Sequence, residues 1–207
     1  WPKMRNVPNE YTEAYFPIRV ERFESIPDTG GPGKPGGDGP DGHSLWPKMR
    51  NVPNEYTEAY FPIRVERFES IPDTGGPGLH RGGHGVKTEY AFLVEGKISI
   101  HDDRWFTYPW GVKGGLPGTR SRKTLIRTDG TSENLPSKVD NVPVQPGDQL
   151  IFETWGGGGW GDRLERPYDV IAYDLEAGLV TAGGLERYGV VVSDDMSIDI
   201  TASDTLR

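Results

Sequence analysis

A run with alternating apolar and polar residues begins at Pro62 and continues to Ile71. Such alternation is typical of a strand with one face on a core and the other in water. The side chains expected to face the core are those of Ile63, Val65 and Phe68, and those expected to face water are Arg64, Glu66 and Arg67. Because Arg67 interrupts the alternation before Phe68, a bulge is expected within this strand.

Further short apolar runs are separated by Gly, Pro and Asp turn signals, which predicts an antiparallel, strand-rich fold. These strands are expected at residues 86–94, 97–104, 123–128, 137–144 and 149–154. Glu95-Gly96 has the composition of a hairpin tip, so the strands on either side of it are expected to pair with each other.

The pattern changes to helical spacing after residue 167. Val170, Ile171 and Leu175 predict a helix over 168–177 with Pro167 in its first turn and Gly178 at its end. A shorter helix is expected at 182–188, a closing strand at 189–192 and a polar tail at 193–207. The fold class is therefore mainly β with short C-terminal helices (α+β), with antiparallel sheets and many loops.

A glycine-rich stretch, Trp155 to Asp162, divides the strand-rich part from the helical end. Its four consecutive glycines permit close approach of another backbone, and the flanking tryptophans provide anchors. The favoured interpretation is structural, with glycines that let two layers of the fold approach closely. The alternative is a cradle for a phosphate or a substrate, but no Lys-Ser/Thr pair follows, so no nucleotide site is predicted.

Residues 1–33 recur without a single substitution as residues 46–78. Natural repeats that stack into solenoids diverge, so this duplication is of another kind. We divide the chain into the duplicated segment 1–33, a β-rich domain 34–192 and the tail 193–207. Two identical copies with different neighbours cannot fill one position, so at most one is expected in the core. The other is expected to pair with another chain in a homo-oligomer, to add an edge strand, or to reflect a recent duplication or a sequence-assembly error.

Composition excludes several classes of protein. The chain has 207 residues, a formal net charge of −8 and no cysteine. The acidic balance argues against a nucleic-acid or anionic-membrane surface, and the lack of cysteine excludes disulfides and thiolate sites. Neither a signal-peptide pattern nor a membrane-spanning apolar run is present, so a cytoplasmic location is expected. Six Trp and nine Tyr residues argue against disorder.

Few residues suggest chemistry by their spacing. His80 and His84 are four apart, but the glycines between and beside them prevent a metal-binding helix. His101 follows a strand and is followed by two aspartates, and a strand end is the favoured interpretation. The group Asp38, Asp41 and His43 superficially suggests a cation loop, yet it lacks the calcium-loop pattern, so a glycine-rich turn is preferred. No Gly-x-Ser-x-Gly elbow is present. No metal ligand is assigned.

The order of motifs resembles the carboxyl-terminal part of the B-type subunit in the hydantoinase B/5-oxoprolinase family. The resemblance extends over roughly residues 34–193. The motifs that carry it are Pro35–His43, Asn51–Glu55, Tyr60–Val65, Asp73–Gly78, Arg81–Val86, Leu135–Lys138, Pro146–Asp148, Gly156–Asp162, Leu164–Arg166, Gly178–Val180 and Tyr188–Val191. The first duplicated segment has no counterpart in the family.

This resemblance implies one half of a two-component enzyme that opens cyclic amides such as hydantoin, 5-oxoproline or a lactam. An A-type partner subunit uses ATP to activate the carbonyl oxygen, and the B-type chain contributes a metal-assisted hydrolytic site. B-type subunits are much longer, and their metal ligands lie in an amino-terminal part without counterpart here. The fragment is therefore expected to be inactive alone and to bind no cofactor, whereas the full complex uses ATP and a divalent metal.

The resemblance also implies which loops face the substrate chamber or the partner subunit. The candidate loop residues are Gly156, Gly157, Gly158, Gly159, Asp162 and His84. Two alternatives remain open at this point. One is a fragment of a related ATP-dependent ketone carboxylase. The other is a non-catalytic interaction module that docks through Trp105, Trp110, Trp155 and Trp160.

Overall fold

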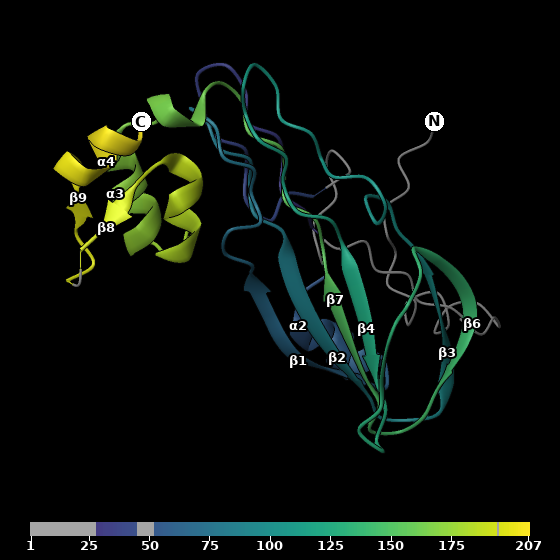
Figure 1. The fold of residues 1–207 in the computed structure, drawn as a ribbon. Helices are drawn as coiled ribbons and strands as arrows, with labels where there is room; N and C mark the ends of the chain where they lie inside the picture. Colours follow the sequence, from purple (N-terminus) through teal and green to yellow (C-terminus); the bar gives the residue numbers. More distant parts are fainter. Residues whose placement is uncertain (1–27, 45–51, 194) are drawn as a thin grey trace.

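A computed structural model describes residues 28–44, 52–193 and 195–207. Two sheets lie at one end of the molecule and a lobe of short helices lies at the other, with glycine-rich segments running between them (Figure 1). The larger sheet is antiparallel throughout, in the order β1 (Ile63–Ser70), β2 (Val86–Phe92), β7 (Gln149–Glu153), β4 (Arg122–Ile126) and β5 (Ser132–Asn134). A second antiparallel sheet pairs β3 (Gly96–His101) with β6 (Lys138–Val144). The fold class predicted from the sequence is confirmed.

The main core forms between these two sheets. Its buried apolar residues come from both of them and from the connections, and are Phe92, Ile100, Leu125, Leu135, Val144 and Leu150. A buried ion pair also joins the two sheets, because Lys123 of β4 contacts the carboxylate of Asp102, which follows β3. Lys123 also lies 4.4 Å from the centre of the Phe152 ring, so its ammonium group is enclosed by a carboxylate and an aromatic face.

The first predicted strand is confirmed as β1, including its bulge, which lies between Val65 and Arg67. The expectation that Phe68 is buried is wrong, since its side chain is 47% exposed. Phe68 pairs with Thr88 across the strand interface, but β1 is the edge strand of the sheet. One side of Phe68 therefore lacks a neighbouring strand that would cover it.

The predicted hairpin at Glu95-Gly96 is wrong, although both of its strands exist. β2 pairs with β1 and β7, whereas β3 pairs with β6 in the other sheet. The backbone of Phe92, at the end of β2, is bonded to the turn before β7: its N–H donates to Asp148 O at 3.0 Å, and its carbonyl accepts from Gly147 N–H at 2.8 Å. The chain then crosses from one sheet to the other instead of turning back.

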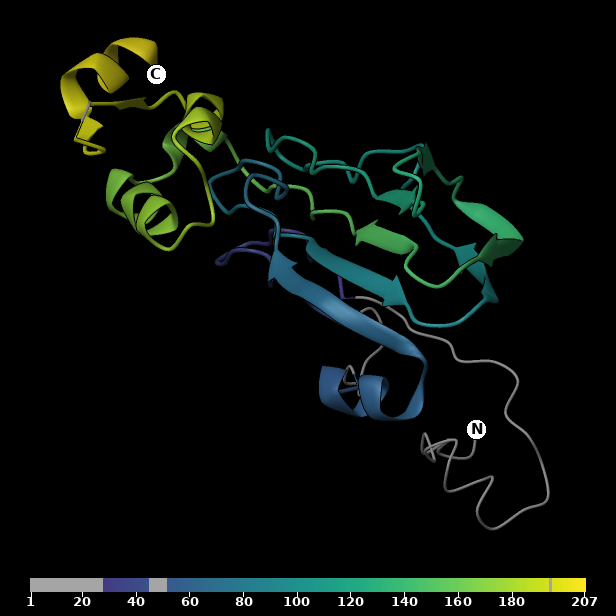
Figure 2. The same ribbon diagram turned by 90° about the horizontal axis from the view of Figure 1, so that it is seen from below.

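The C-terminal lobe confirms the predicted helices and adds one in the tail. It contains η1 (Arg163–Glu165), α3 (Tyr168–Glu176), η2 (Gly183–Tyr188), β8 (Val191–Val192), β9 (Ile198–Asp199) and α4 (Ile200–Leu206). Gly178 ends α3 with φ of 68°, in the left-handed region. A second core of Ile171, Val180, Leu185, Tyr188 and Val190 holds the lobe together, and Figure 2 shows it projecting from the sheets.

Five elements of the described residues were not predicted, namely α2, β5, η1, β9 and α4. Helix α2 (Asn54–Tyr60) precedes β1, where the sequence suggested only a lead into the strand. Within residues 195–207, which were expected only as a polar tail, the chain forms β9 and α4. Asp199 caps α4 by accepting a hydrogen bond from Ala202 N–H at 2.9 Å, and Ser203 is fully buried. The cap at Asp199 and the buried Ser203 thus fix α4 at its start and against the lobe.

The glycine bundle lies between the sheets and the lobe. We define it as residues 28–43, 73–85, 109–119 and 155–161, which run outside regular helices and strands. The two identical hexapeptides 28–33 and 73–78, one from each duplicated copy, both lie in it, with Thr29 and Thr74 buried. The expectation that only one copy contributes to the core is therefore wrong for these residues. The earlier residues of the first copy lie outside the described part of the chain.

Candidate functional site

The tetraglycine stretch Gly156–Gly159 runs through the middle of the glycine bundle and is buried. Gly157 donates its N–H to Gly83 O at 2.9 Å, and its carbonyl accepts from Gly76 N–H at 2.8 Å. The next carbonyl, that of Gly158, accepts from Gly33 N–H at 2.9 Å. Gly159 donates its N–H to Leu116 O at 2.9 Å. Three segments, 28–43, 73–85 and 109–119, thus bond to the same stretch, whereas a strand within a flat sheet has only two neighbours.

Side chains are excluded along the tetraglycine stretch by neighbouring backbone. A Cβ atom at Gly156 would overlap Thr74 O, one at Gly157 would overlap Gly31 O, and one at Gly158 would overlap Trp110 O. Both hexapeptides contribute to these contacts, the second through Thr74 and the first through Gly31. The structural interpretation of the glycines thus has a geometric reason, namely backbone packed on backbone from several sides.

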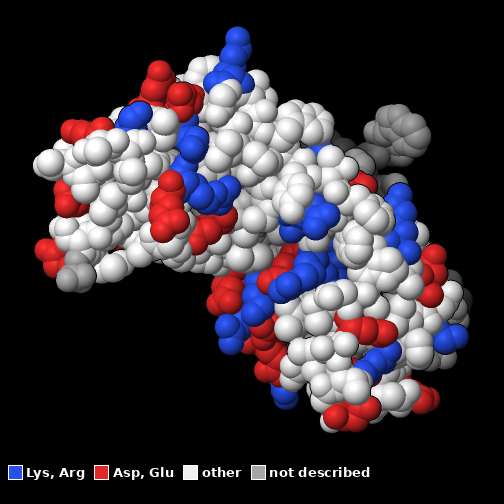
Figure 3. All heavy atoms as spheres, in the orientation of Figure 1, with Lys and Arg blue, Asp and Glu red and all other residues white. Residues whose placement is uncertain are grey.

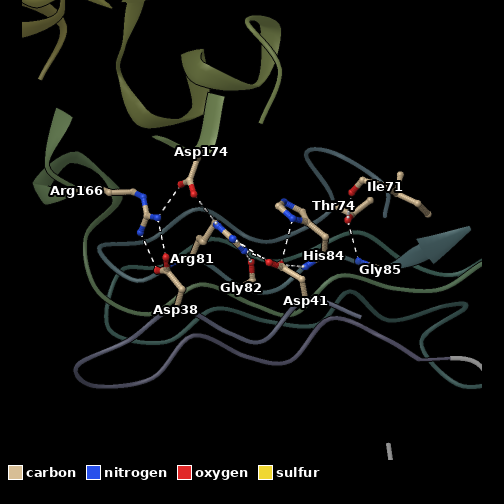
Figure 4. Close-up of polar contacts among 10 residues, drawn as sticks. All are labelled: Asp38, Asp41, Ile71, Thr74, Arg81, Gly82, His84, Gly85, Arg166 and Asp174. Atoms are coloured by element: carbon tan, nitrogen blue, oxygen red, sulfur yellow. Dashed lines mark hydrogen bonds and ion pairs between the residues drawn. The ribbon is translucent and has the colours of Figure 1, made fainter. Parts of the chain in front are cut away.

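Two arginines and three aspartates, from the bundle and from the chain that follows it, form a network (Figure 4). Arg166 donates to both carboxylate oxygens of Asp38, each at 2.8 Å, and to Asp174 at 2.7 Å. Arg81 donates to both oxygens of Asp41, at 2.8 and 3.0 Å, and to Asp174 at 3.3 Å. These bidentate pairs fix orientation as well as distance.

This network joins the bundle to the helical lobe. Asp38 and Asp41 come from the first stretch of the bundle and Arg81 from the second, whereas Asp174 belongs to α3. Both guanidinium groups and Asp174 are almost fully buried. Such buried charges are tolerated because each is paired and hydrogen-bonded. The turn that carries Asp38 and Asp41 superficially suggested a site for a metal cation. In the structure, both carboxylates are instead paired with arginine side chains.

The network holds Asp38 and Asp41 in the charged form. Burial by itself raises the pKa of Asp41, but hydrogen bonds from His84 and Arg81 outweigh burial and hold that pKa well below its usual range. Asp38 behaves in the same way, with Arg166 as its main partner. The pKa of the Arg81 guanidinium is raised by Asp41 despite burial. Charged pairs thus persist over the whole neutral range.

His84, a predicted loop residue, is 1% exposed. Its backbone N–H donates to Asp41 Oδ1 at 2.7 Å, and its ring Nδ1 lies 3.2 Å from the same carboxylate oxygen. His80 instead stacks on Trp160 with ring centres 5.6 Å apart, and its Nε2 accepts from Gly36 N–H at 3.2 Å. The two histidines are thus engaged in different contacts.

Asp162 is exposed at the end of the bundle, unlike the other predicted loop residues. Its carboxylate accepts from Leu164 N–H at 2.9 Å and caps η1. The preceding Gly161 has φ of 77°, which an L side chain rarely adopts. The glycine at this position allows the chain to leave the bundle and enter the lobe.

Sequence reasoning missed Arg81, Arg166 and Asp174 as members of a single cluster. Asp38 and Arg166 are separated by 128 positions, and no local spacing connects them. The one available signal was the pair of aspartates in a glycine-rich turn, which carry charge that needs partners if buried. Across the described ranges, no three His, Cys, Asp or Glu side chains gather as a possible metal site. No helix in that part of the chain is both long and apolar enough to cross a bilayer.

Comparisons with known proteins agree with this architecture. The family model for hydantoinase B/oxoprolinase matches residues 32–163. A protein from Pseudomonas sp. (strain NS671), described as the B-type subunit of a D-/L-hydantoinase, is 35% identical over 206 residues, which is 98% of this chain and 27% of the relative. An alignment of this extent includes most of the first duplicated segment, so the expectation that this segment has no counterpart in the family is wrong for this relative. The crystal structure of the ATP-dependent caprolactamase from Pseudomonas jessenii superposes with a TM-score of 0.74 at 25% identity, covering 86% of this chain and 32% of that one.

An acetone carboxylase structure superposes with a TM-score of 0.69 at 21% identity, over 83% of this chain and 28% of that one, and this similarity shows the fold alone. The family match covers more than half of the 207 residues. The chain therefore belongs to the hydantoinase B/oxoprolinase family. It spans about a quarter of the length of the hydantoinase relative that it matches.

Substitution within the tetraglycine stretch tests the bundle. Gly157→Ala is expected to lower the free energy of unfolding by more than about 3 kcal/mol, because its methyl group would overlap backbone atoms that have no room to move. The matched control is Gly37→Ala, where a Cβ would meet nothing closer than 3.9 Å. Urea unfolding measures both variants. Equal stability of the two would show that the bundle is not closely packed.

The charge network predicts acid sensitivity. Because the pKa of Asp41 is lower in the folded state, its stabilisation is present above the unfolded pKa of about 4 and is lost as the pH falls through the folded pKa. Asp41→Asn is expected to cost about 2 kcal/mol at pH 7 and to flatten the fall in stability between about pH 4 and pH 2. Glu95→Gln, at an exposed position between β2 and β3, is the control. If the free energy of unfolding of Asp41→Asn fell with decreasing pH as steeply as that of the wild-type chain, this role of Asp41 would be contradicted.

Proposed function

We propose that this chain is the carboxyl-terminal part of a B-type subunit of an ATP-dependent cyclic amide hydrolase, with hydantoin as the representative substrate. The observation that carries the proposal is 35% identity, over 206 residues, with the B-type chain of a hydantoinase. Because this identity extends over nearly the whole chain, the similarity is not limited to the few motifs identified in the sequence. The structural match to a caprolactamase adds a second cyclic amide hydrolase.

The chain acts in this proposal as a scaffold within a larger assembly. The aligned region is 27% of the hydantoinase relative and 32% of the caprolactamase chain, so most of a family member's polypeptide lies outside it. The chain by itself is therefore inactive. ATP is used by an A-type partner subunit, and a divalent metal belongs to the complete complex.

The predicted loop residues then divide into two roles. Asp162 is exposed at the end of the bundle, so its loop faces the substrate chamber or the A-type partner. Gly156–Gly159 and His84 are buried, and they act by holding the neighbouring loops in position. Rigid support of this kind matters because a displacement of about 1 Å in a catalytic loop can reduce a rate by about a hundredfold.

The carboxylase alternative has weaker support. It rests on the acetone carboxylase structure, and a similarity at 21% identity shows a shared fold but gives no information on the reaction. Hydrolysis needs water as the second reactant, whereas carboxylation needs a carboxyl donor. An assay for consumption of bicarbonate with acetone therefore separates the two reactions.

A chimera tests the proposal. The aligned region of the B-type chain of the Pseudomonas sp. hydantoinase is replaced by this chain, and the chimera is co-expressed with that enzyme's A-type partner. We expect ATP-dependent opening of hydantoin, measured by mass spectrometry of the ring-opened product, and its loss in a matched chimera that carries Gly157→Ala.

The isolated 207-residue chain is the second arm of this experiment and is expected to leave hydantoin intact, with or without ATP. Ring opening by the isolated chain would refute the scaffold role. A folded chimera that binds the A-type partner but leaves hydantoin unchanged would refute the assignment to cyclic amide hydrolysis.

A further inference from the structure

A row of large aromatic side chains is exposed beside the glycine bundle. Phe106, Tyr108 and Trp110 are 72%, 52% and 64% exposed. They are alternate residues of one segment that has no regular helix or strand structure. Aromatic exposure on this scale at three alternate positions is unusual for a surface that only meets water, and marks an interaction site.

This aromatic row is held in place before any partner binds. The guanidinium group of Arg120 lies 4.7 Å from the centre of the Tyr108 ring, and that of Arg104 lies 4.9 Å from the centre of the Trp110 ring. Trp105 points inward and donates its Nε1–H to Leu135 O at 3.1 Å. A preformed set of Trp, Tyr and Arg side chains is the composition of a binding hot spot, since little conformational entropy is lost on contact.

The segment that carries the aromatic row has basic side chains only. Residues 104–122 contain four basic residues and no acidic residue, in a chain whose net charge is −8. Arg104, Lys113 and Arg120 belong to this set and are at least partly exposed. A partner surface that fits the aromatic row therefore offers apolar area together with carboxylates.

The C-terminal lobe carries such a surface. A groove of about 580 Å³ lies between α3 and the β9–α4 segment. Its apolar lining consists of Ala172, Leu175, Met196, Ile198 and Ile200. The charged residues that line it are Asp169 and Glu176, and no basic residue does so. In Figure 3, Asp and Glu side chains lie along the outer edge of this lobe, on the left.

We propose that the aromatic row of one copy of this chain inserts into the groove of a second copy. The row supplies aromatic rings and positive charge, and the groove supplies apolar lining and negative charge. Each buried aromatic side chain removes roughly 150–250 Å² of its surface from water, so two or three rings supply a substantial part of a small interface. The contact uses residues 104–120 and the lobe, and not the duplicated segment.

Such a contact is heterologous, because the row and the groove are different surfaces. Each added copy leaves one row and one groove open, so association continues into rings or chains. Paired opposite charges make the association weaker at high salt. This association of the 207-residue chain does not depend on the enzymatic proposal above.

Two variants and their mixture test the proposal by sedimentation velocity. The row variant carries Phe106→Ser and Trp110→Ser, and the groove variant carries Met196→Lys and Ile200→Lys. We expect concentration-dependent oligomers for the wild-type chain and at least tenfold weaker association for each variant alone. An equimolar mixture should form a 1:1 heterodimer that grows no further, because only one intact row and one intact groove remain to pair.

Val94→Ser, which changes an exposed residue outside both surfaces, is the control and should associate like the wild-type chain. Formation of the heterodimer also shows that both variants are folded. The proposal is overturned if the wild-type chain stays monomeric at millimolar concentration, or if either variant associates as strongly as the wild-type chain. A mixture that contains only monomers would overturn it as well.

Discussion

Close packing of backbone on backbone in the glycine bundle is the constraint on which the rest of this structure depends. Residues 156–159 are bonded by three other segments, and a Cβ atom at any of these four positions would overlap neighbouring backbone atoms. Glycine costs conformational entropy in such an ordered segment. The cost is offset by hydrogen bonds whose buried donors and acceptors would otherwise lack partners. The bundle thereby connects two separate hydrophobic cores.

The arginine–aspartate network connects the bundle to the lobe in a second way. Asp174 accepts hydrogen bonds from both Arg81 and Arg166, so one carboxylate of α3 is tied to arginines of two other segments. Because these groups are buried, loss of one partner leaves a charge without compensation. The position of the lobe relative to the bundle therefore depends on side chains, whereas the interior of the bundle depends on main-chain atoms. In a family enzyme, these two kinds of contact would fix the loop at Asp162.

Much of the fold was predictable from local patterns. Alternation identified β1 and its bulge, and helical spacing together with Gly178 identified α3. The pairing of β2 and β3 was not predictable, because a two-residue turn signal does not reveal that Phe92 bonds to the turn before β7. The close packing of the glycines at 156–159 was suggested by composition. Their neighbours were not, since the partners of Gly157 lie 74 and 81 positions earlier in the chain.

Hydrogen exchange of the glycine amides is the most direct test of the account. The N–H groups of Gly33, Gly76, Gly83, Gly157 and Gly159 are all bonded to backbone carbonyls within the bundle. We expect them to exchange as slowly as the amides of β2 and β7, because the bundle opens only when the whole fold does. Exchange of Gly157 and Gly159 at the rate of an unstructured peptide, with β2 and β7 still protected, would contradict the central claim.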